Sequence, residues 1–388
     1  MGSRHGHLRD TLTGWLFVSP ATIILGVFGI FPVFYTLYVS VNRWRLTRVA
    51  FSGLNNYGLL FGNSPLALLG VASALAGAGA AVFLIRGAAG RRAAGVLLLA
   101  ASAIGFVVAL PYLASQGDKD VFDSLRVTIW YSLFTVPVQL AGGLILAVLL
   151  TRKMKGRQAF RVLYLVPYIA PTVATAAVFE LLFSLRPDSF ANQVLKILGV
   201  GPLQWLQEPK GIFTLLFAAG PDAAQAAAAA APAGVIPVYW GEWAQGPSLA
   251  LTAIVFYSWW VFIGYYALIY INGLGSIPRQ LYEAAEVDGA SAARRFFSIT
   301  LPLLSPTTYF LTMLGVIGTF KAFTQLYVLR NTAASGTVDP MSVLIFFTAF
   351  RKGNMGYASA VAILLFVIVL GLTWIQQRTG ERTVNYGD

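Results

Sequence analysis

Long apolar runs constrain this chain more than any other feature of its sequence. Eight runs reach roughly the 20 residues that an α-helix needs to cross a bilayer, and each carries little or no charge. Only 11% of the residues are charged, whereas soluble domains average about 25%. The sequence therefore predicts an all-α integral membrane protein with eight transmembrane helices, at residues 15–40, 66–85, 93–114, 127–150, 160–184, 248–272, 303–329 and 357–376.

Basic residues between these runs indicate the orientation of the chain. If the N-terminus is inside, fifteen Lys and Arg residues lie in short cytoplasmic segments, and eleven lie in outer segments of considerably greater total length. This bias places both termini in the cytoplasm. The net charge of +12 is scattered over short loops, with no basic domain, so we expect contact with membrane lipid and no nucleic-acid partner.

The sequence offers little for catalysis or metal binding. It contains no cysteine, and its two histidines, His5 and His7, lie in the N-terminal tail. No acid–base pair, nucleophile or metal cluster is apparent, so we do not expect an enzyme or a metal site. No G-x-x-x-x-G-K-[ST] phosphate loop occurs, so the chain cannot bind ATP in that manner, and any energy-requiring step would depend on an ion gradient or on another subunit.

The chain divides into a core and an apparent insertion. Two runs rich in Ala and Gly, joined by a basic turn, form a predicted hairpin that could pack another helix closely or serve as peripheral padding. An outer loop at 185–247 holds an alanine-rich piece that is mobile or a short surface helix. The predicted parts are a cytoplasmic tail (1–14), a first span and outer segment (15–61), the inserted hairpin (62–120), the core (121–377) and a second tail (378–388).

One polar stretch, residues 282–306, lies between two apolar runs and so forms a loop at a membrane face. Its pattern predicts a helical turn over Tyr282–Val287, a sharp turn at Asp288-Gly289 and a second short helix over Ala290–Ser298. Small residues let such a helix enter a partner's groove, where Glu283 would meet a basic partner. We expect the apolar side chains that follow to hold the loop to its own bundle, namely Phe296, Phe297 and Ile299.

This stretch resembles the EAA loop of bacterial ABC importer permeases, in which E-A-A is followed at fixed spacing by G and by I-x-L-P. Glu283, Ala284, Ala285, Gly289, Ile299, Leu301 and Pro302 match that pattern. In that family the loop, here 275–302, is a coupling helix that docks on a separate ATPase. The plain alternative is an ordinary amphipathic cytosolic loop. The resemblance implies ATPase-coupling roles for Glu283, Ala284, Ala285, Asp288, Gly289, Ala290 and Pro302.

The resemblance extends from residue 15 to about 57 and from 121 to the C-terminus. GLNNY, FRVLYLVPYIAPT, SIPRQLYEAAEVDGA and ITLPLLSP are similar to the larger permease of carbohydrate ABC importers, the type related to the maltose permease. It implies a bacterial cell-membrane permease that imports a mono- or oligosaccharide. The implied partners are a second permease in a heterodimer, two copies of an ATPase subunit that binds ATP and Mg²⁺, and an extracytoplasmic solute-binding protein.

The same resemblance implies a substrate path along three spans. Several of the family's polar contact positions have changed here, which argues against maltose itself. The remaining aromatic rings can stack on a pyranose and the hydroxyl and amide groups can bond sugar hydroxyls, although aromatics at this spacing also pack helices. The implied path residues are Tyr168, Thr172, Ser258, Phe262, Tyr265, Thr319, Ala322 and Gln325.

Two alternatives stay open at this point. The same architecture could carry another solute, such as a glycerol phosphate diester or a peptide. An ion-coupled secondary carrier would belong to a different class, and it normally shows internal repeats and ionisable residues near the bilayer midplane. We find no such repeat, and the EAA-like loop has no evident task in a carrier of that class.

Overall fold

The computed structural model describes residues 3–45, 47–62, 105, 107–151, 155–197, 199, 201–217 and 234–383. The chain is mostly helical and forms two compact units, each described by itself. One unit comprises Met1–Leu60 and Ile345–Leu364, and the other comprises Phe61–Leu344 and Leu365–Asp388. The last long helix, α20 (Met355–Thr383), begins in the first unit and ends in the second.

The first unit pairs a long apolar segment with a small hairpin. Its elements are α1 (Ser3–Ile24), the π-helix η1 (Leu25–Ile30), α2 (Phe31–Ser40), the antiparallel strands β1 (Asn42–Trp44) and β2 (Arg48–Phe51), most of α3 (Asn55–Phe61), the π-helix η5 (Phe347–Arg351) and the start of α20. Asn56, from the GLNNY segment, closes this unit, because its amide donates to the Ser40 carbonyl at 2.7 Å. The buried Asn56 amide nitrogen thus has backbone partners at the end of α2, the carbonyls of Ser40 and Asn42.

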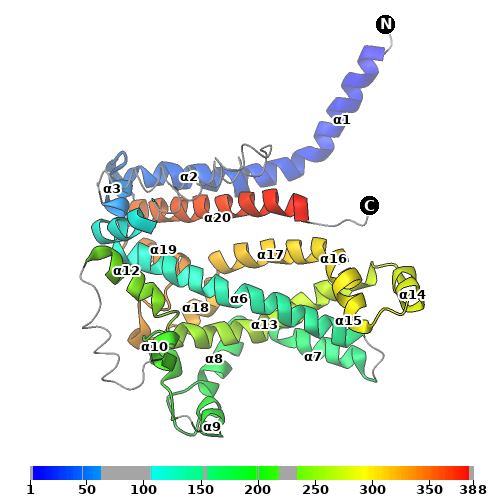
Figure 1. The fold of residues 1–388 in the computed structure, drawn as a ribbon. Helices are drawn as coiled ribbons and strands as arrows, with labels where there is room; N and C mark the ends of the chain where they lie inside the picture. Colours follow the sequence, from blue (N-terminus) through cyan, green and yellow to red (C-terminus); the bar gives the residue numbers. More distant parts are fainter. Residues whose placement is uncertain are drawn as a thin grey trace. The chain divides into compact units, whose positions relative to one another are not determined.

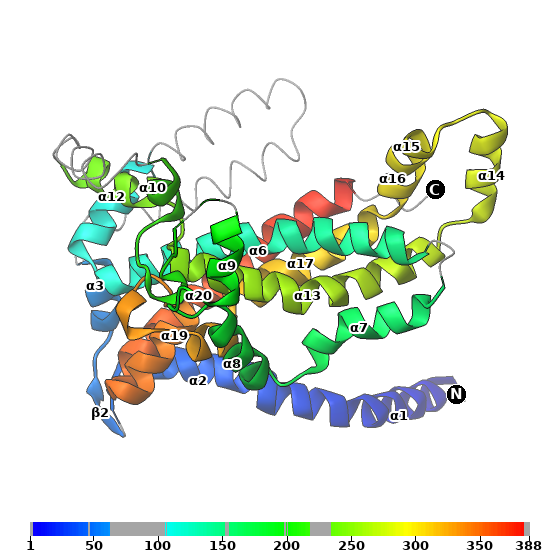
Figure 2. The same cartoon turned by 90° about the horizontal axis from the view of Figure 1, so that it is seen from below.

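The second unit is a bundle around α6 (Lys119–Thr151) and α13 (Leu249–Gly275). Figures 1 and 2 show these two helices side by side with α7 (Arg157–Ile169), and α17 (Ser305–Phe320) lies against α6. Its other elements are the helix Val107–Gln116, α8 (Thr172–Leu182), α9 (Phe190–Ile197), η2 (Trp205–Gln207), α10 (Ile212–Phe217), α12 (Val235–Ala244), α14 (Arg279–Val287), α15 (Ala292–Arg295), η3 (Phe296–Thr300), α16 (Leu301–Leu303), α18 (Thr324–Val328), η4 (Thr332–Ala334) and α19 (Met341–Phe346).

Glycines set how closely these helices approach. A side chain at Gly143 of α6 would meet the Cβ atom of Tyr266 of α13 at 2.6 Å, and one at Gly264 would collide with the backbone oxygen of Tyr164 in α7. Small residues at such crossings let helices pack closely in a membrane, where burial against lipid supplies little driving force. Around these crossings lies a buried cluster that includes Ala147, Tyr266, Ala267, Tyr270, Leu304 and Leu311.

The predicted span 160–184 is sharply bent. Helices α7 and α8 meet at an angle of 96°, and Ala170 between them is extended, with φ −66° and ψ 147°. Proline disfavours helical geometry in the residue before it, so Pro171 ends α7 at this point. The bend expected from the two prolines of VPYIAPT is confirmed.

Five described helices are long and apolar enough to cross a membrane, and the bent pair α7–α8 brings the number to six. They coincide with six of the eight predicted runs, so the chain is a multi-pass membrane protein. The run 66–85 lies outside the described residues, and of the run 93–114 only residues 105 and 107–114 are described, the latter within the helix Val107–Gln116. The count of eight therefore stays a prediction. The run 303–329 is not continuous, because α17 ends at Phe320 and α18 begins at Thr324.

The described parts of the outer loop pack by themselves and against α13. Backbone bonds join Ile212 to Pro247 and Leu249 to Lys210, so α10 lies at the start of α13. Asn192 accepts from Trp205 Nε1 at 2.9 Å, and Trp205 is buried. Most of the alanine-rich piece lies outside the described residues.

Candidate functional site

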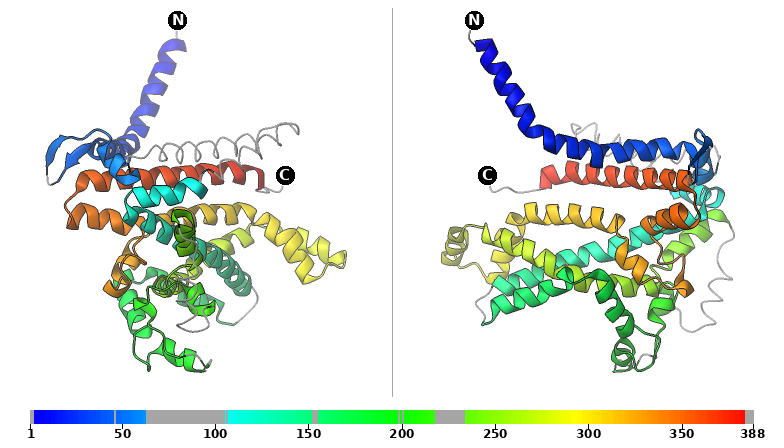
Figure 3. Two further views of the ribbon diagram at one scale, coloured as in Figure 1. Left: turned by 60° about the vertical axis from the view of Figure 1, so that its left-hand side comes forward. Right: turned by 180° about the vertical axis from the view of Figure 1, so that it is seen from behind.

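The polar loop after α13 contains the first helix and the turn that its sequence predicts, whereas the second helix is shorter than the predicted 290–298 and continues as the π-helix η3. Figures 1 to 3 show α14 and α15 projecting beyond the end of the α6–α13 bundle. Helix α14 ends in a left-handed glycine, Gly289, with φ +73°. The Gly289 N–H donates to the Glu286 carbonyl at 3.1 Å, and the Ala290 N–H donates to the Ala285 carbonyl at 2.8 Å. These two bonds form a Schellman cap, which satisfies carbonyls that a helix end leaves free.

The exposed face of α14 carries part of the motif. Glu283, Ala284 and Val287 are exposed and share one helix face, with Asp288 and Gly289 exposed beyond it. On the other side, the Tyr282 hydroxyl lies 2.8 Å from that of Thr300. Ala285, Ala290 and Pro302 are half-buried. The loop thus presents a small, mildly acidic face outward while Tyr282 fixes its position.

The anchoring prediction for the loop is only partly correct. Ile299 packs against the buried cluster of the bundle, and Phe296 is half-buried. Phe297, however, is 65% exposed and lies in the π-helical turn η3, where its ring meets that of Phe296 edge-on at 5.2 Å. An ion pair between Arg295 and Glu286, 3.0 Å apart, supplies a second link across the loop.

A second feature is a cavity of about 240 Å³ inside the bundle. Six of the eight predicted path residues line it together, from α7, α13 and the α17–α18 region. The full lining is Tyr131, Thr135, Gln139, Tyr168, Phe262, Tyr265, Tyr266, Leu314, Gly315, Gly318, Thr319, Ala322 and Gln325.

Aromatic rings form one wall of this cavity. Tyr168 and Tyr265 stack with centroids 4.4 Å apart, and Phe262 meets Tyr168 edge-on at 5.8 Å. Tyr168 remains 41% exposed, so its ring is accessible. Gly315 makes room for the neighbouring ring, since a Cβ atom there would lie 2.5 Å from the Tyr266 hydroxyl. The wall can offer flat apolar faces with hydroxyl groups at their edges.

Hydrogen bonds fix the polar residues of the lining. The Tyr131 hydroxyl lies 2.7 Å from Ser258 Oγ and accepts from Gln325 Nε2 at 3.0 Å. The Thr319 hydroxyl donates to Ser132 Oγ at 2.8 Å. Buried networks of this kind hold their members in fixed positions. The amide and hydroxyl groups that remain near the cavity are therefore preorganised.

Two predicted path residues lie off the cavity. Ser258 is fully buried, and its hydroxyl lies between Tyr131 and the Ile254 carbonyl. Thr172 begins α8, and its carbonyl accepts from the Tyr257 hydroxyl at 3.3 Å. Of the two, only Ser258 bonds a residue that lines the cavity, namely Tyr131.

Sequence reasoning missed the contribution of α6. Tyr131, Thr135 and Gln139 of that helix line the cavity. Their spacing of four residues, in an otherwise apolar run, is the signal that marks one polar helix face.

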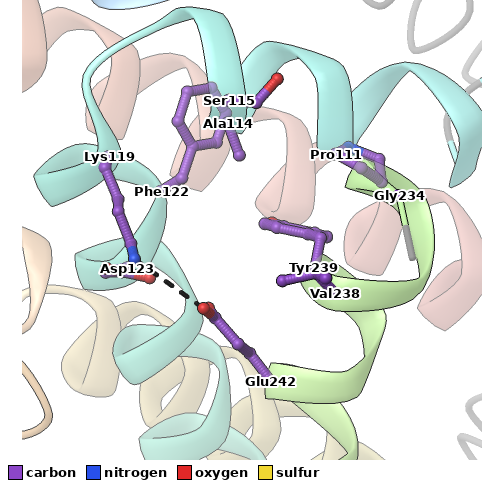
Figure 4. Close-up of a pocket in the computed structure, with 10 residues that line it drawn as sticks. All are labelled: Pro111, Ala114, Ser115, Lys119, Phe122, Asp123, Gly234, Val238, Tyr239 and Glu242. Carbon is purple, nitrogen blue, oxygen red and sulfur yellow. Dashed lines mark ion pairs between the residues drawn. The ribbon is translucent and has the colours of Figure 1, made fainter. Parts of the chain in front are cut away.

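A larger cavity, of about 500 Å³, lies at the start of α6 and holds none of the predicted residues. Figure 4 shows it between the helix Val107–Gln116, α6 and α12, with the ion pair of Lys119 and Glu242 at its edge. Arg126 bridges Glu242 at 2.5 Å and Asp123 at 3.0 Å. Burial raises the pKa of the Tyr239 phenol, which therefore stays neutral here. The mainly apolar lining and the ion pairs indicate that this region packs the outer loop against the core.

The sequence of this chain is similar to those of known transport proteins. Residues 139–384 match the family described as "Binding-protein-dependent transport system inner membrane component". The trehalose/maltose transport system permease protein MalF of Thermococcus litoralis is 31% identical over 71% of this chain and 80% of its own. The sn-glycerol-3-phosphate transport system permease protein UgpA of Agrobacterium fabrum is 28% identical over 73% of this chain and 83% of its own.

A solved structure shares the fold. A bacterial ABC transporter involved in the import of the acidic polysaccharide alginate contains a chain with a TM-score of 0.58 and 17% identity. The match covers 97% of this chain and 98% of that one. Because the family match spans more than half of the chain, the protein is a member of the binding-protein-dependent transport system inner membrane components, the membrane-embedded permeases of ABC importers.

Proposed function

We propose that this chain is one half of the translocation pore of an ABC importer that carries a neutral mono- or oligosaccharide into the cytoplasm. The solute would pass through the 240 Å³ cavity. The observation that carries this proposal is the combination in one cavity of stacked tyrosine rings and fixed hydroxyl and amide groups. Aromatic faces match the apolar faces of a pyranose, and hydroxyl and amide groups match its hydroxyls.

The charge of the cavity lining favours a sugar over a phosphorylated solute. The relative UgpA is named for such a solute, sn-glycerol 3-phosphate. None of the described residues around the cavity is charged. Phosphate groups in proteins are normally met by Arg, Lys or clusters of N–H donors, because burying an unpaired anion is very unfavourable. A neutral polyhydroxyl solute needs no such partner, which favours the sugar over a glycerol phosphate diester.

Energy would reach the cavity through the projecting loop. The exposed face of α14, with Glu283 and Ala284, fits docking on a separate ATPase subunit. Helix α13 runs from the outer loop to this loop and carries Phe262 and Tyr265 of the cavity, so movement of α14 would be transmitted to the aromatic wall. The family description supports an external solute-binding protein. A second permease, two ATPase copies and cytoplasmic termini complete the proposed assembly.

Uptake by the reconstituted assembly tests the transport proposal. The complete complex is placed in proteoliposomes with ATP inside and the binding protein outside, and uptake of labelled maltose, trehalose and sn-glycerol 3-phosphate is followed. We expect uptake of a sugar that requires ATP and the binding protein and survives an ionophore. Uptake of sn-glycerol 3-phosphate alone would contradict the sugar assignment. Uptake by this chain alone, abolished by the ionophore, would show a secondary carrier instead.

The double variant Glu283→Ala with Gly289→Pro tests the coupling role. Proline fixes φ near −65°, whereas Gly289 requires φ +73°, so the α14 cap cannot form. We expect the complex to assemble in the membrane, while uptake and stimulated ATP hydrolysis are lost. The variant Glu208→Ala, in the outer segment, removes an equal charge and should keep both. Normal uptake by the double variant would exclude the coupling role.

A further inference from the structure

Helix α6 forms a wall of the cavity. Its residues Tyr131, Thr135 and Gln139 are four positions apart, so they share one helix face, and all three line the cavity. Two of them have protein partners. Tyr131 bonds Ser258 and Gln325, and Gln139 Nε2 donates to the Ser258 carbonyl at 3.1 Å. Thr135 lies between these two residues.

Thr135 differs from three other threonines of the spanning helices, Thr128, Thr252 and Thr312. Its side chain is 1% exposed, yet its hydroxyl has no hydrogen-bond partner among the residues that the structure describes. Thr128, Thr252 and Thr312 each donate to the carbonyl four residues earlier, at 2.7 to 2.9 Å. Buried hydroxyls are nearly always bonded, because an unmade bond there costs the full desolvation of the group.

We infer that α6 is a solute-binding span and that the Thr135 hydroxyl hydrogen-bonds a hydroxyl group of the transported solute. Thr135 lines the cavity, so a partner from outside the chain can reach it only from that side. A sugar hydroxyl both donates and accepts, and so can pair with it after a small rotation of the threonine side chain. This inference rests on the proposed sugar transport and adds a fourth span to the three implied by the sequence.

A positioned hydroxyl of this kind would select among solutes. A site built to bond a hydroxyl rejects an analogue that lacks it, because the buried group then stays unpaired. Tyr131 and Gln139 are held by Ser258, so Thr135 is the member of the row whose bond forms only with a solute. Thr135 is therefore a specificity-determining residue.

The variant Thr135→Val tests the inference, because valine keeps the shape and removes only the hydroxyl. Uptake of labelled maltose, trehalose and raffinose is measured with the complete complex in proteoliposomes, alongside the melting temperature. For each sugar that the wild type takes up, we expect KM to rise roughly threefold to tenfold, as for the loss of one hydrogen bond. The melting temperature should stay equal or rise, since no protein bond is lost. Thr135→Ser should restore most of the affinity.

Thr312→Val is the matched control, since the Thr312 hydroxyl bonds the Thr308 carbonyl and lies outside the cavity lining. It should leave KM unchanged. An unchanged KM for Thr135→Val, with wild-type uptake intact, would overturn the inference and leave the proposed function standing. A lower melting temperature without rescue by serine would show a structural role and also overturn it. Absence of uptake of all three sugars by the wild type contradicts the proposed function itself.

Discussion

The ring of Tyr168 stacks on the ring of Tyr265, with centroids 4.4 Å apart and planes 16° apart. The two residues lie almost a hundred positions apart in the sequence, on α7 and α13. Gly264 lets α7 approach α13 this closely, and Pro171, three residues after Tyr168, ends α7 beyond its aromatic contact. The close approach at Gly264 and the end of α7 before Pro171 thus position the stacked pair, and both rings line the cavity.

Removing the exposed ring of this pair should weaken sugar uptake. Tyr168→Ala takes away a stacking face worth about 1 kcal/mol, so we expect KM to rise roughly fivefold. Tyr168→Phe keeps the ring and should stay closer to the wild type. Uptake kinetics in proteoliposomes provide the measurement.

The control is a stacked pair outside the cavity. Phe179 and Phe183 lie 4.4 Å apart at 19°, and neither lines the cavity. Phe183→Ala should affect the melting temperature and not KM. Equal effects of the two alanine variants on KM would show that the Tyr168 ring only packs helices.

Gly289→Ala should weaken coupling without disturbing the fold. Nothing lies within 4 Å of the position where the Cβ atom would be, so the cost comes from the left-handed backbone, about 1 to 2 kcal/mol. We expect lower stimulation of ATP hydrolysis by the binding protein and, because the same strain destabilises the folded chain, a melting temperature a few degrees lower. Gly289→Asn, which tolerates this backbone better, should be milder. Gly275→Ala, in open space at the end of α13, should show no loss, and a loss there would refute the argument.

Much of the architecture could be predicted because the membrane restricts the choices. Apolar runs such as 127–150 must be helices, and the Asp288-Gly289 pair must turn. The structure adds a break in the run 303–329. Helix α17 ends at Phe320, and the Ala322 carbonyl is instead bonded by Ser342 at 2.5 Å. No proline lies at this break, and Ser342, whose hydroxyl bonds the Ala322 carbonyl, comes twenty residues later in the chain.

The candidate site was harder to predict for the same reason. The resemblance to the maltose permease type places Ser258 on the solute path. In the structure Ser258 is instead hydrogen-bonded to Tyr131 and Gln139. Those two α6 residues replace it at the cavity. Periodicity shows that α6 has a polar face, but not which neighbouring helix or cavity that face meets.

The charge cluster at the start of α6 should contribute to stability through Arg126. Its side chain is 18% exposed and bridges Asp123 and Glu242, so Arg126→Ala leaves two half-buried carboxylates close together. We expect a loss of about 1 to 3 kcal/mol, below the range for fully buried pairs. Lys119 contacts the same Glu242 at 3.8 Å but is 71% exposed, so Lys119→Ala should cost less than about 1 kcal/mol. Thermal unfolding of the purified complex compares the two, and equal losses would contradict this ranking.

The crossing of α7 and α13 provides the last prediction. Any side chain at Gly264 would collide with the Tyr164 backbone oxygen, which cannot rotate away, so Gly264→Ala must push α7 outward. Because α7 carries Tyr168, the stack on Tyr265 should open and the cavity should lose its aromatic wall. We expect a lower melting temperature together with a KM increase at least as large as that of Tyr168→Ala. Gly371→Ala in α20, where nothing lies within 4 Å, serves as the matched control. A Gly264→Ala complex with wild-type KM would mean that the position of α7 does not determine solute binding.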